Sequence, residues 1–125
     1  MTLDDIRRQI GAGDWFVHGD DGSVHGALRL LWADPGVWDE QPEDAGYVHG
    51  LVIGRAHAGV GLGGQLLAWA AAETVRAGRR FLRLDFSSPT PGLRRYYRDK
   101  GFREVGRRDF ENGWHTVVLL ARPAG

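Results

Sequence analysis

Five glycines fall within eleven residues of the 125-residue chain, at positions 54, 59, 61, 63 and 64. They stand between a β-rich run, Tyr47–Ile53, and a run with helical periodicity that begins near Gly63. Glycine lets backbone N–H groups crowd around a ligand, and the first N–H groups of a helix have no partner within the helix. Such a turn favours a phosphate group, although a tight packing turn alone would show the same glycines.

Histidines are the other chemistry-bearing residues before the glycine turn. His49 lies in the run Tyr47–Ile53 and titrates in a range useful for proton transfer, unless it is a strand histidine that faces solvent. His18 and His25 flank a turn and are expected to face each other across two strands. Because two histidines without a third convergent ligand rarely bind a metal, no metal site is predicted.

Composition excludes several classes of function. The chain has no cysteine, so a thiolate metal site, a cysteine nucleophile and an acyl relay through a protein thiol are excluded. Sixteen basic residues balance sixteen acidic ones, which gives no argument for nucleic acid or an anionic membrane as a partner. No apolar run approaches the roughly 20 residues that span a bilayer, and no signal peptide is evident, so we expect a cytoplasmic protein.

The charge is unevenly distributed. Residues 1–50 carry ten acidic residues and three arginines, so the rest of the neutral chain is basic. Five of the acids lie between Asp34 and Asp44, in a segment with two prolines and no periodicity that is expected to be an exposed loop. This acidic segment argues for a cationic ligand.

The elements that position these residues follow from periodicity and turn chemistry. We expect a short helix over 2–10, strands over 15–18 and 24–32, a strand over 47–53, a helix over 63–77 ended by Gly78, a parallel strand over 81–86, a helix from Thr90 to Gly101, and a hairpin of 102–110 with 114–121. Leu66, Leu67, Ala70, Thr74 and Val75 are expected on the buried face of the helix over 63–77. One domain over 1–125 accounts for the whole length.

Two nucleotide-binding folds fit this order poorly. No Gly-Lys-Ser/Thr ends the glycine turn, which excludes a P-loop. A dinucleotide-binding fold predicts repeated strand-helix-strand units and a ribose-binding acid, for which Asp85 has about the right spacing. The glycines, however, come after three strands and are followed by only one further unit.

Two segments together resemble the GNAT family of N-acetyltransferases. YVHGLVIGRAHAGVGLGG, residues 47–64, resembles the central strand and pyrophosphate loop of that family, and RFLRLDFSSPTPGLRRYYRDKGF, residues 80–102, resembles its next strand and helix. The resemblance covers roughly residues 14–121. It implies an α/β (α+β) fold with a mixed, mostly antiparallel sheet, a splayed central parallel strand pair and flanking helices.

The resemblance also implies the cofactor and its contacts. Acetyl-CoA is the expected acyl donor, with backbone groups of Leu51 and Ile53 on the pantetheine and amides of Gly59, Gly61, Gly63 and Gly64 on the pyrophosphate. Tyr97 matches the family tyrosine that protonates the departing thiolate. Thr90 stands where many members have an asparagine that binds pantetheine, and a plain helix N-cap explains it equally well. Arg94, Arg95 and Arg98 are expected either to meet the coenzyme's 3′-phosphate or to be solvated.

Acyl transfer to a primary amine requires a base, because an alkylammonium of pKa near 10.4 must lose a proton before it attacks. His49 is the first candidate, at a strand position where some family members also have histidine. Asp39 and Glu40 are the runners-up, acting through water or as anchors for a cationic amine. Gly50 interrupts the expected strand over 47–53, and a glycine in a strand often marks a bulge or a close approach of the backbone to a ligand. Backbone N–H groups beside Gly50 are expected to stabilise the oxyanion.

The sequence departs from the family at two places. Ala58 stands where the loop usually begins with Arg or Gln, which predicts weakened cofactor binding. The family ordinarily has a strand and two helices before Trp15, where this chain offers about thirteen residues, so Trp15–His18 is expected at an exposed sheet edge and a homodimer through that edge is a hypothesis. The rival functions are a non-catalytic acyl-CoA sensor and a nucleotide-binding module unrelated to CoA.

Overall fold

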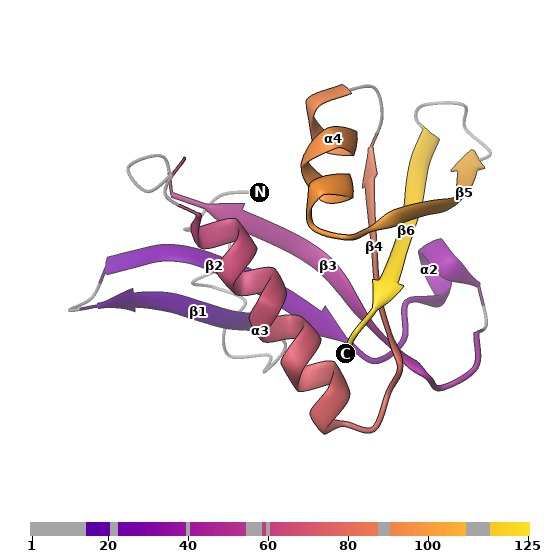
Figure 1. The fold of residues 1–125 in the computed structure, drawn as a ribbon, viewed down its shortest axis with the longest axis horizontal. Coiled ribbons are helices and arrows are strands. Elements are labelled where there is room, and N and C mark those ends of the chain that lie inside the picture. The colour runs from indigo at the N-terminus through magenta and orange to yellow at the C-terminus, as the bar shows by residue number, and fades with distance from the viewer. Residues whose placement is uncertain are drawn as a thin grey trace.

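The computed structural model describes residues 15–20, 23–39, 41–54, 59, 61–87, 91–109 and 116–125. The elements in chain order are β1 (Trp15–Asp20), β2 (Ser23–Leu31), α2 (Pro35–Trp38), β3 (Ala45–Ile53), α3 (Leu62–Arg76), β4 (Phe81–Ser87), α4 (Pro91–Asp99), β5 (Arg103–Asp109) and β6 (Thr116–Pro123) (Figure 1). Within the described residues, strand and helix types match the sequence expectation, except in the segment after β2.

The strands form one mixed sheet in the order β1-β2-β3-β4-β6-β5. Only β3 and β4 pair in parallel, and the other neighbours are antiparallel, which confirms the predicted fold class. The last strand of the chain lies inside the sheet, where it buries Val117, Val118 and Leu120. β5 takes the edge because most of its side chains are exposed, and charged residues suit an edge strand.

The two parallel strands pair only over their first halves. Registered pairs end at Val48 and Leu84. Beyond that point β3 stays paired with β2, while β4 stays paired with β6. The strands therefore diverge, as Figure 1 shows, and the fork opens at His49 and Asp85, the next residue of each strand.

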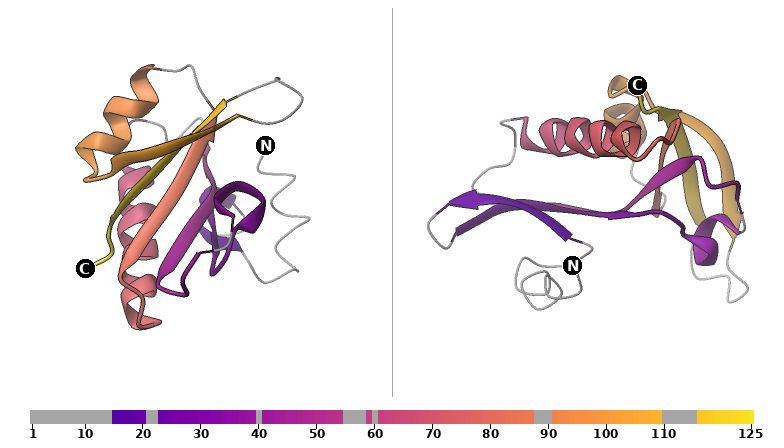
Figure 2. Two further views of the ribbon diagram at one scale, coloured as in Figure 1. Left: turned by 90° about the vertical axis from the view of Figure 1, so that its right-hand side faces the viewer. Right: turned by 90° about the horizontal axis from the view of Figure 1, so that it is seen from below.

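Helices cover both faces of the sheet. Figure 2 shows α3 and α4 on one side and α2 on the other. The main core joins the inner face of α3 to the sheet through Leu28, Leu30, Val48, Leu62, Leu66, Leu67, Ala70, Ala71, Leu82, Leu84, Phe86, Phe102, Val118 and Leu120. Leu93, Tyr96 and Tyr97 of α4 are partly buried and pack against this core. A smaller cluster on the α2 side contains Trp38, Ala45 and Tyr47.

A close crossing holds α3 against β3. A Cβ atom added at Gly46 would lie 2.5 Å from Oγ1 of Thr74, which is fully buried and donates a hydrogen bond to the Ala70 carbonyl at 2.8 Å. Only glycine allows this approach, and it fixes the distance between the helix and the strand that carries His49.

Two expectations require correction. The segment 34–46 is not a plain loop, because Pro35 starts the one-turn helix α2 and Trp38 buries its ring at the end of that helix. Val75 is 49% exposed, so it lies outside the buried face of α3, where Leu66, Leu67, Ala70 and Thr74 do lie.

Some expectations fall outside the described residues: the helix over 2–10, Glu40, Ala58, Thr90 and the turn of the hairpin between 110 and 114. Within the described sheet, β1 is an edge strand that pairs only with β2, and homodimerisation there stays a prediction. No helix in the described part of the chain has the length and apolar character needed to cross a membrane.

Candidate active site

A pocket of about 480 Å³ lies between β3, the glycine turn and α4. Its lining brings together six of the predicted site residues: Leu51, Ile53, Gly59, Gly61, Gly63 and Tyr97. Leu62, Leu93, Tyr96 and Lys100 complete it. The described site residues left out of this lining are Gly64, next in α3, and His49, at the fork.

The glycine turn is shaped by backbone conformation rather than by side chains. Gly59 and Gly61 have φ of 82° and 83°, a left-handed region that other residues adopt only under strain. Gly61 is the N-cap of α3, and no side chain among the described residues caps that end. The N–H groups of the first turn are thus left for a ligand, and the helix dipole favours an anion there.

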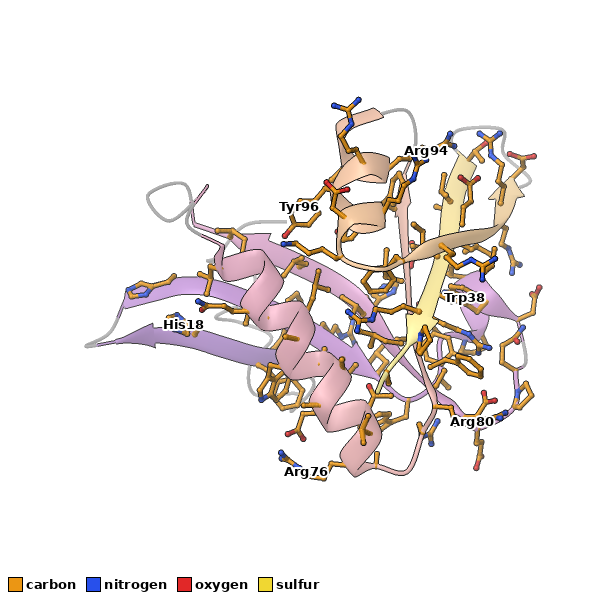
Figure 3. All side chains as sticks on the ribbon, in the orientation of Figure 1. His18, Trp38, Arg76, Arg80, Arg94 and Tyr96 are labelled. Atoms are coloured by element: carbon orange, nitrogen blue, oxygen red, sulfur yellow. The ribbon has the colours of Figure 1, made fainter. Side chains whose placement is uncertain are left out.

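Helix α4 closes the pocket over this turn. Figure 3 shows Tyr96 on the side of α4 that faces the start of α3, and a Cβ at Gly63 would lie 2.5 Å from its hydroxyl. A Cβ at Gly64 would lie 3.0 Å from Nζ of Lys100. Lys100, the residue after α4, is a site residue that the sequence did not indicate, and its Nζ lies over the Tyr96 ring at 5.5 Å from the centroid.

Tyr97 sits deeper in the same pocket. Its ring stacks on Phe86 at 5.7 Å between centroids and meets Phe102 edge-on at 5.9 Å. Burial raises the pKa of Tyr97 to about 12, and the charges of Tyr96 and Asp85 act in the same direction. The phenol therefore stays protonated at neutral pH and is available as a hydrogen-bond donor.

His49 is held by a residue from the preceding connection. Its Nδ1 lies 2.8 Å from Oδ2 of Asp34, whose side chain is only 10% exposed, whereas that of His49 is 37% exposed. The hydrogen bond to Asp34 raises the pKa of His49, against burial, which lowers it. The charges of Asp34 and Asp85 raise that pKa further, and Arg29 lowers it.

Asp85 joins His49 and Asp34 at the mouth of the fork. One carboxylate oxygen of each aspartate and one ring nitrogen of His49 all lie within 4.8 Å of one another. Burial raises the pKa of Asp85, His49 lowers it, and Asp34 raises it. The same donor types could bind a divalent cation, but two ligands of one tetrahedral zinc lie about 3.3 Å apart when each bond is about 2.0–2.1 Å. At 2.8 Å, the contact between His49 and Asp34 has the length of a hydrogen bond.

The cluster lies on the α2 face of the sheet. Tyr47 and Arg83 come two residues before His49 and Asp85, and Arg83 donates a hydrogen bond to the Tyr47 hydroxyl at 2.8 Å. Tyr47 belongs to the small core on that face. Because side chains alternate along a strand, His49 and Asp85 share this face. The Leu51 and Ile53 side chains pack with the main core on the other face.

A β-bulge separates the two halves of β3. Leu28 pairs with Leu51 and Leu30 pairs with Val48, so Arg29 opposes both His49 and Gly50. A bulge disrupts the ladder and re-aims the strand. A Cβ at Gly50 would lie 3.0 Å from the Trp15 indole ring, so glycine permits the strand to pass this ring. The predicted interruption at Gly50 is confirmed, and N–H groups beside it remain the proposed oxyanion donors.

The other candidates have structural partners. Asp39, a runner-up for the base, accepts a hydrogen bond from Nη1 of Arg108 at 2.7 Å. Arg94 lies 3.8 Å from Glu104, whereas Arg95 and Arg98 are exposed. The rings of His18 and His25 do face each other, 5.4 Å apart.

Comparison with known proteins decides the family. The model of the acetyltransferase (GNAT) family matches residues 2–102. This chain belongs to the GNAT acetyltransferase family. Over 112 residues it is 31% identical to YesJ, an uncharacterised N-acetyltransferase of Bacillus subtilis (strain 168). That similarity covers 85% of this chain and 62% of the relative, so the chain spans less than two thirds of the length of YesJ.

Solved structures show the GNAT fold. A GNAT acetyltransferase from Listeria monocytogenes 4b F2365 superposes with a TM-score of 0.74 at 23% identity, covering 98% of this chain and 72% of that one. A GNAT acetyltransferase from Elizabethkingia anophelis, solved with acetyl-CoA bound, superposes with a TM-score of 0.73 at 17% identity over 98% and 83%. At these identities the structural similarity supports the fold alone, and any statement about the reaction must be argued from the residues of the site.

Proposed function

We propose that this chain transfers the acetyl group of acetyl-CoA to a primary amine by direct attack. The observation that carries the proposal is one pocket that joins Leu51 and Ile53 of the diverging strand, the glycine turn, and the protonated Tyr97. The strand, the turn and the hydrogen-bond donor are the three parts that a thioester donor needs for its arm, its pyrophosphate and its sulfur.

The donor's pantetheine arm suits the open edge of β3. Beyond Val48 this edge no longer pairs with β4, although β3 continues to Ile53. Unpaired backbone groups at a strand edge can bind an extended, amide-containing ligand in the manner of an added strand. The arm would run from the fork toward Gly59 and Gly61, where the uncapped start of α3 meets the pyrophosphate.

His49 is the proposed base for the acceptor. The amine arrives as an ammonium ion, and one proton passes to the imidazole and then to water. The free amine attacks the thioester carbonyl carbon, the C–N bond forms and the C–S bond breaks. The second amine proton ends on the sulfur, so the products are the amide, free coenzyme A and one solvent proton.

Tyr97 stabilises the departing thiolate as a hydrogen-bond donor. A thiol has a reference pKa near 8.5, whereas that of Tyr97 is about 12. Permanent transfer of its proton to the sulfur is therefore uphill. The phenol instead donates to the negative charge that develops on sulfur, and the amine's second proton completes the thiol.

A cationic acceptor is favoured by the surface beside Asp34. A second pocket of about 430 Å³ contains the carboxylates Asp39 and Glu43 with the rings of Trp32 and Tyr47. Asp34 also lines it, but its carboxylate is engaged by His49. Carboxylates attract ammonium groups, whereas the two rings already have guanidinium groups over them, those of Arg79 and Arg83. Arg79 also lines this pocket, but its guanidinium is engaged by the carbonyls of Trp32 and Ala45, each at 3.0 Å.

An amine panel tests the proposed function. The full chain is incubated with acetyl-CoA and with monoamines, diamines, polyamines, aminoglycosides and peptides, and product is detected by thiol release and mass spectrometry. We expect acetylation, fastest with amines that carry a second positive charge. Binding of acetyl-CoA without turnover of any amine would instead favour an acyl-CoA sensor.

A further inference from the structure

The side chain of Asp34 does not do what its position predicts. It is the N-cap residue of α2, where aspartate usually accepts a hydrogen bond from a backbone N–H of the first turn. Asp34 makes no side-chain cap bond. Its backbone carbonyl accepts from Val37 and Trp38, while its carboxylate, nearly buried, turns to Nδ1 of His49.

This hydrogen bond selects the tautomer of the ring. A carboxylate accepts hydrogen bonds and donates none, so the proton between the two groups resides on Nδ1 of His49. In the neutral imidazole the lone pair for proton transfer is therefore on Nε2. The bond also fixes the ring plane, so the base meets its substrate in one orientation.

The charged groups around His49 come from three elements besides its own. Asp34 precedes α2, Asp85 lies on β4 across the fork, and Arg29 lies on β2 opposite the bulge. Asp34 and Asp85 favour the imidazolium, and Arg29 disfavours it. With both carboxylates ionised, a proton on His49 changes the charge of this three-residue cluster from −2 to −1. Uptake of a proton from a cationic amine is thus favoured by the local field.

We propose that Asp34 is the positioning residue of the base: it holds His49 in the Nδ1–H tautomer, with Nε2 as the atom that takes the acceptor's proton. This inference rests on the acetyl transfer proposed above. Asp34 itself touches neither substrate in this account and acts only through His49.

Asp34→Asn is the test variant, and Asp44→Asn is its control. Asp44 ends the same connection between β2 and β3 and pairs with Arg80 at 3.1 Å, so it matches Asp34 as a partnered aspartate without a contact to His49. Nitrogen NMR of the labelled chain reports the tautomer and titration of His49 without any need for activity. The pH profile of kcat/KM and the acetyl-CoA affinity are measured on the same samples.

We expect neutral His49 of the unmodified chain to carry its proton on Nδ1. In Asp34→Asn its titration should move to lower pH, the acid limb of kcat/KM should move with it, and kcat should fall at least about tenfold. Acetyl-CoA affinity should stay within about twofold. Asp34→Glu should recover part of the rate, and Asp44→Asn should match the unmodified chain.

The outcomes separate this inference from the proposed function. An unmodified chain that acetylates no amine refutes the function, whereas an Nε2–H tautomer refutes the role of Asp34 whatever the activity. The inference is also overturned if the unmodified chain is active, His49→Gln is inactive, and Asp34→Asn keeps both the rate and the acid limb of the unmodified chain. Loss of activity on chelation with recovery on added zinc would overturn it as well, because the three side chains would then be serving a metal.

Discussion

Val48 and Leu84 are the last residues that pair between the two parallel strands of the sheet. One residue further along each strand, His49 and Asp85 face the same side of the sheet and lie within reach of one carboxylate, that of Asp34. The end of pairing thus places the pocket proposed for the extended donor on one face and the cluster proposed to accept a proton on the other. The thioester carbonyl is proposed to lie between them, at the fork.

Tyr97→Phe should lower kcat by at least about tenfold, because removal of one preorganised hydrogen-bond donor to developing charge typically costs roughly 10²–10³-fold in kcat. Acetyl-CoA affinity should change little, since the ring that packs on Phe86 and Phe102 is retained. Tyr96→Phe is the matched control and should keep most of the rate. Thiol release at saturating amine measures both, and equal losses in the two variants would argue against the role of Tyr97.

Gly61→Ala should weaken acetyl-CoA binding severalfold and destabilise the chain. A φ of 83° costs an L-residue roughly 1–2 kcal/mol, and relief of that strain would distort the first turn of α3. Gly92→Ala is the control, because a Cβ there meets nothing within 4 Å and its φ is not positive. Calorimetric titration measures acetyl-CoA affinity in both variants, and urea unfolding measures their stability. The same change in both variants would contradict the role of the glycine turn in binding acetyl-CoA.

Gly46→Ala should destabilise the fold by about 1–3 kcal/mol through overpacking, because its Cβ would meet Oγ1 of Thr74 at 2.5 Å. Thr74→Ala removes that oxygen. The double variant should therefore be more stable than the sum of the single effects predicts. A double-mutant cycle in urea measures the coupling between the two substitutions. Strict additivity would contradict a clash between the new Cβ and the Thr74 hydroxyl.

The pair of His49 and Asp34 should stabilise the fold most at low pH. The folded-state pKa of His49 is raised above its ordinary value of 6.5, so this stability is fully present below pH 6.5 and is lost as pH rises through the folded pKa. The difference in unfolding free energy between the unmodified chain and Asp34→Asn should be larger at pH 5.5 than at pH 9.

Asp44→Asn is the control for this pH dependence. Its partner Arg80 stays charged across the range, so its stability difference should be flat. Asp85 is present in all three chains and largely cancels in the comparison. A difference for Asp34→Asn that is the same at both pH values would contradict the ionic part of this contact.

The donor side of the site could be predicted from the sequence because its parts are local. A strand, five glycines and a helix follow one another within about thirty residues, and each has its own signal in residue type and spacing. The glycine turn follows from these local signals, whereas Leu51, Ile53 and Tyr97 are implied by the resemblance to the GNAT family, and all of them line one pocket. The bulge was also signalled, by the glycine at position 50 within an otherwise β-rich run.

The acceptor side depends on contacts between distant segments. Asp34 stood among five acids in a segment without periodicity, and only the folded chain shows that it is the one turned to His49, fifteen residues away. The sequence alone offers Asp85 only as a possible ribose-binding acid. Its position opposite His49 follows from the register of two parallel strands, which the sequence does not specify residue by residue.

Calorimetric titration of the full chain with acetyl-CoA, run beside desulfo-coenzyme A and NAD, tests the central claim most directly. The pocket between β3, the glycine turn and α4 predicts micromolar binding of both CoA compounds and none of NAD. Binding of NAD in preference to CoA, or binding of neither CoA compound, would contradict the assignment of this pocket to an acetyl-CoA donor.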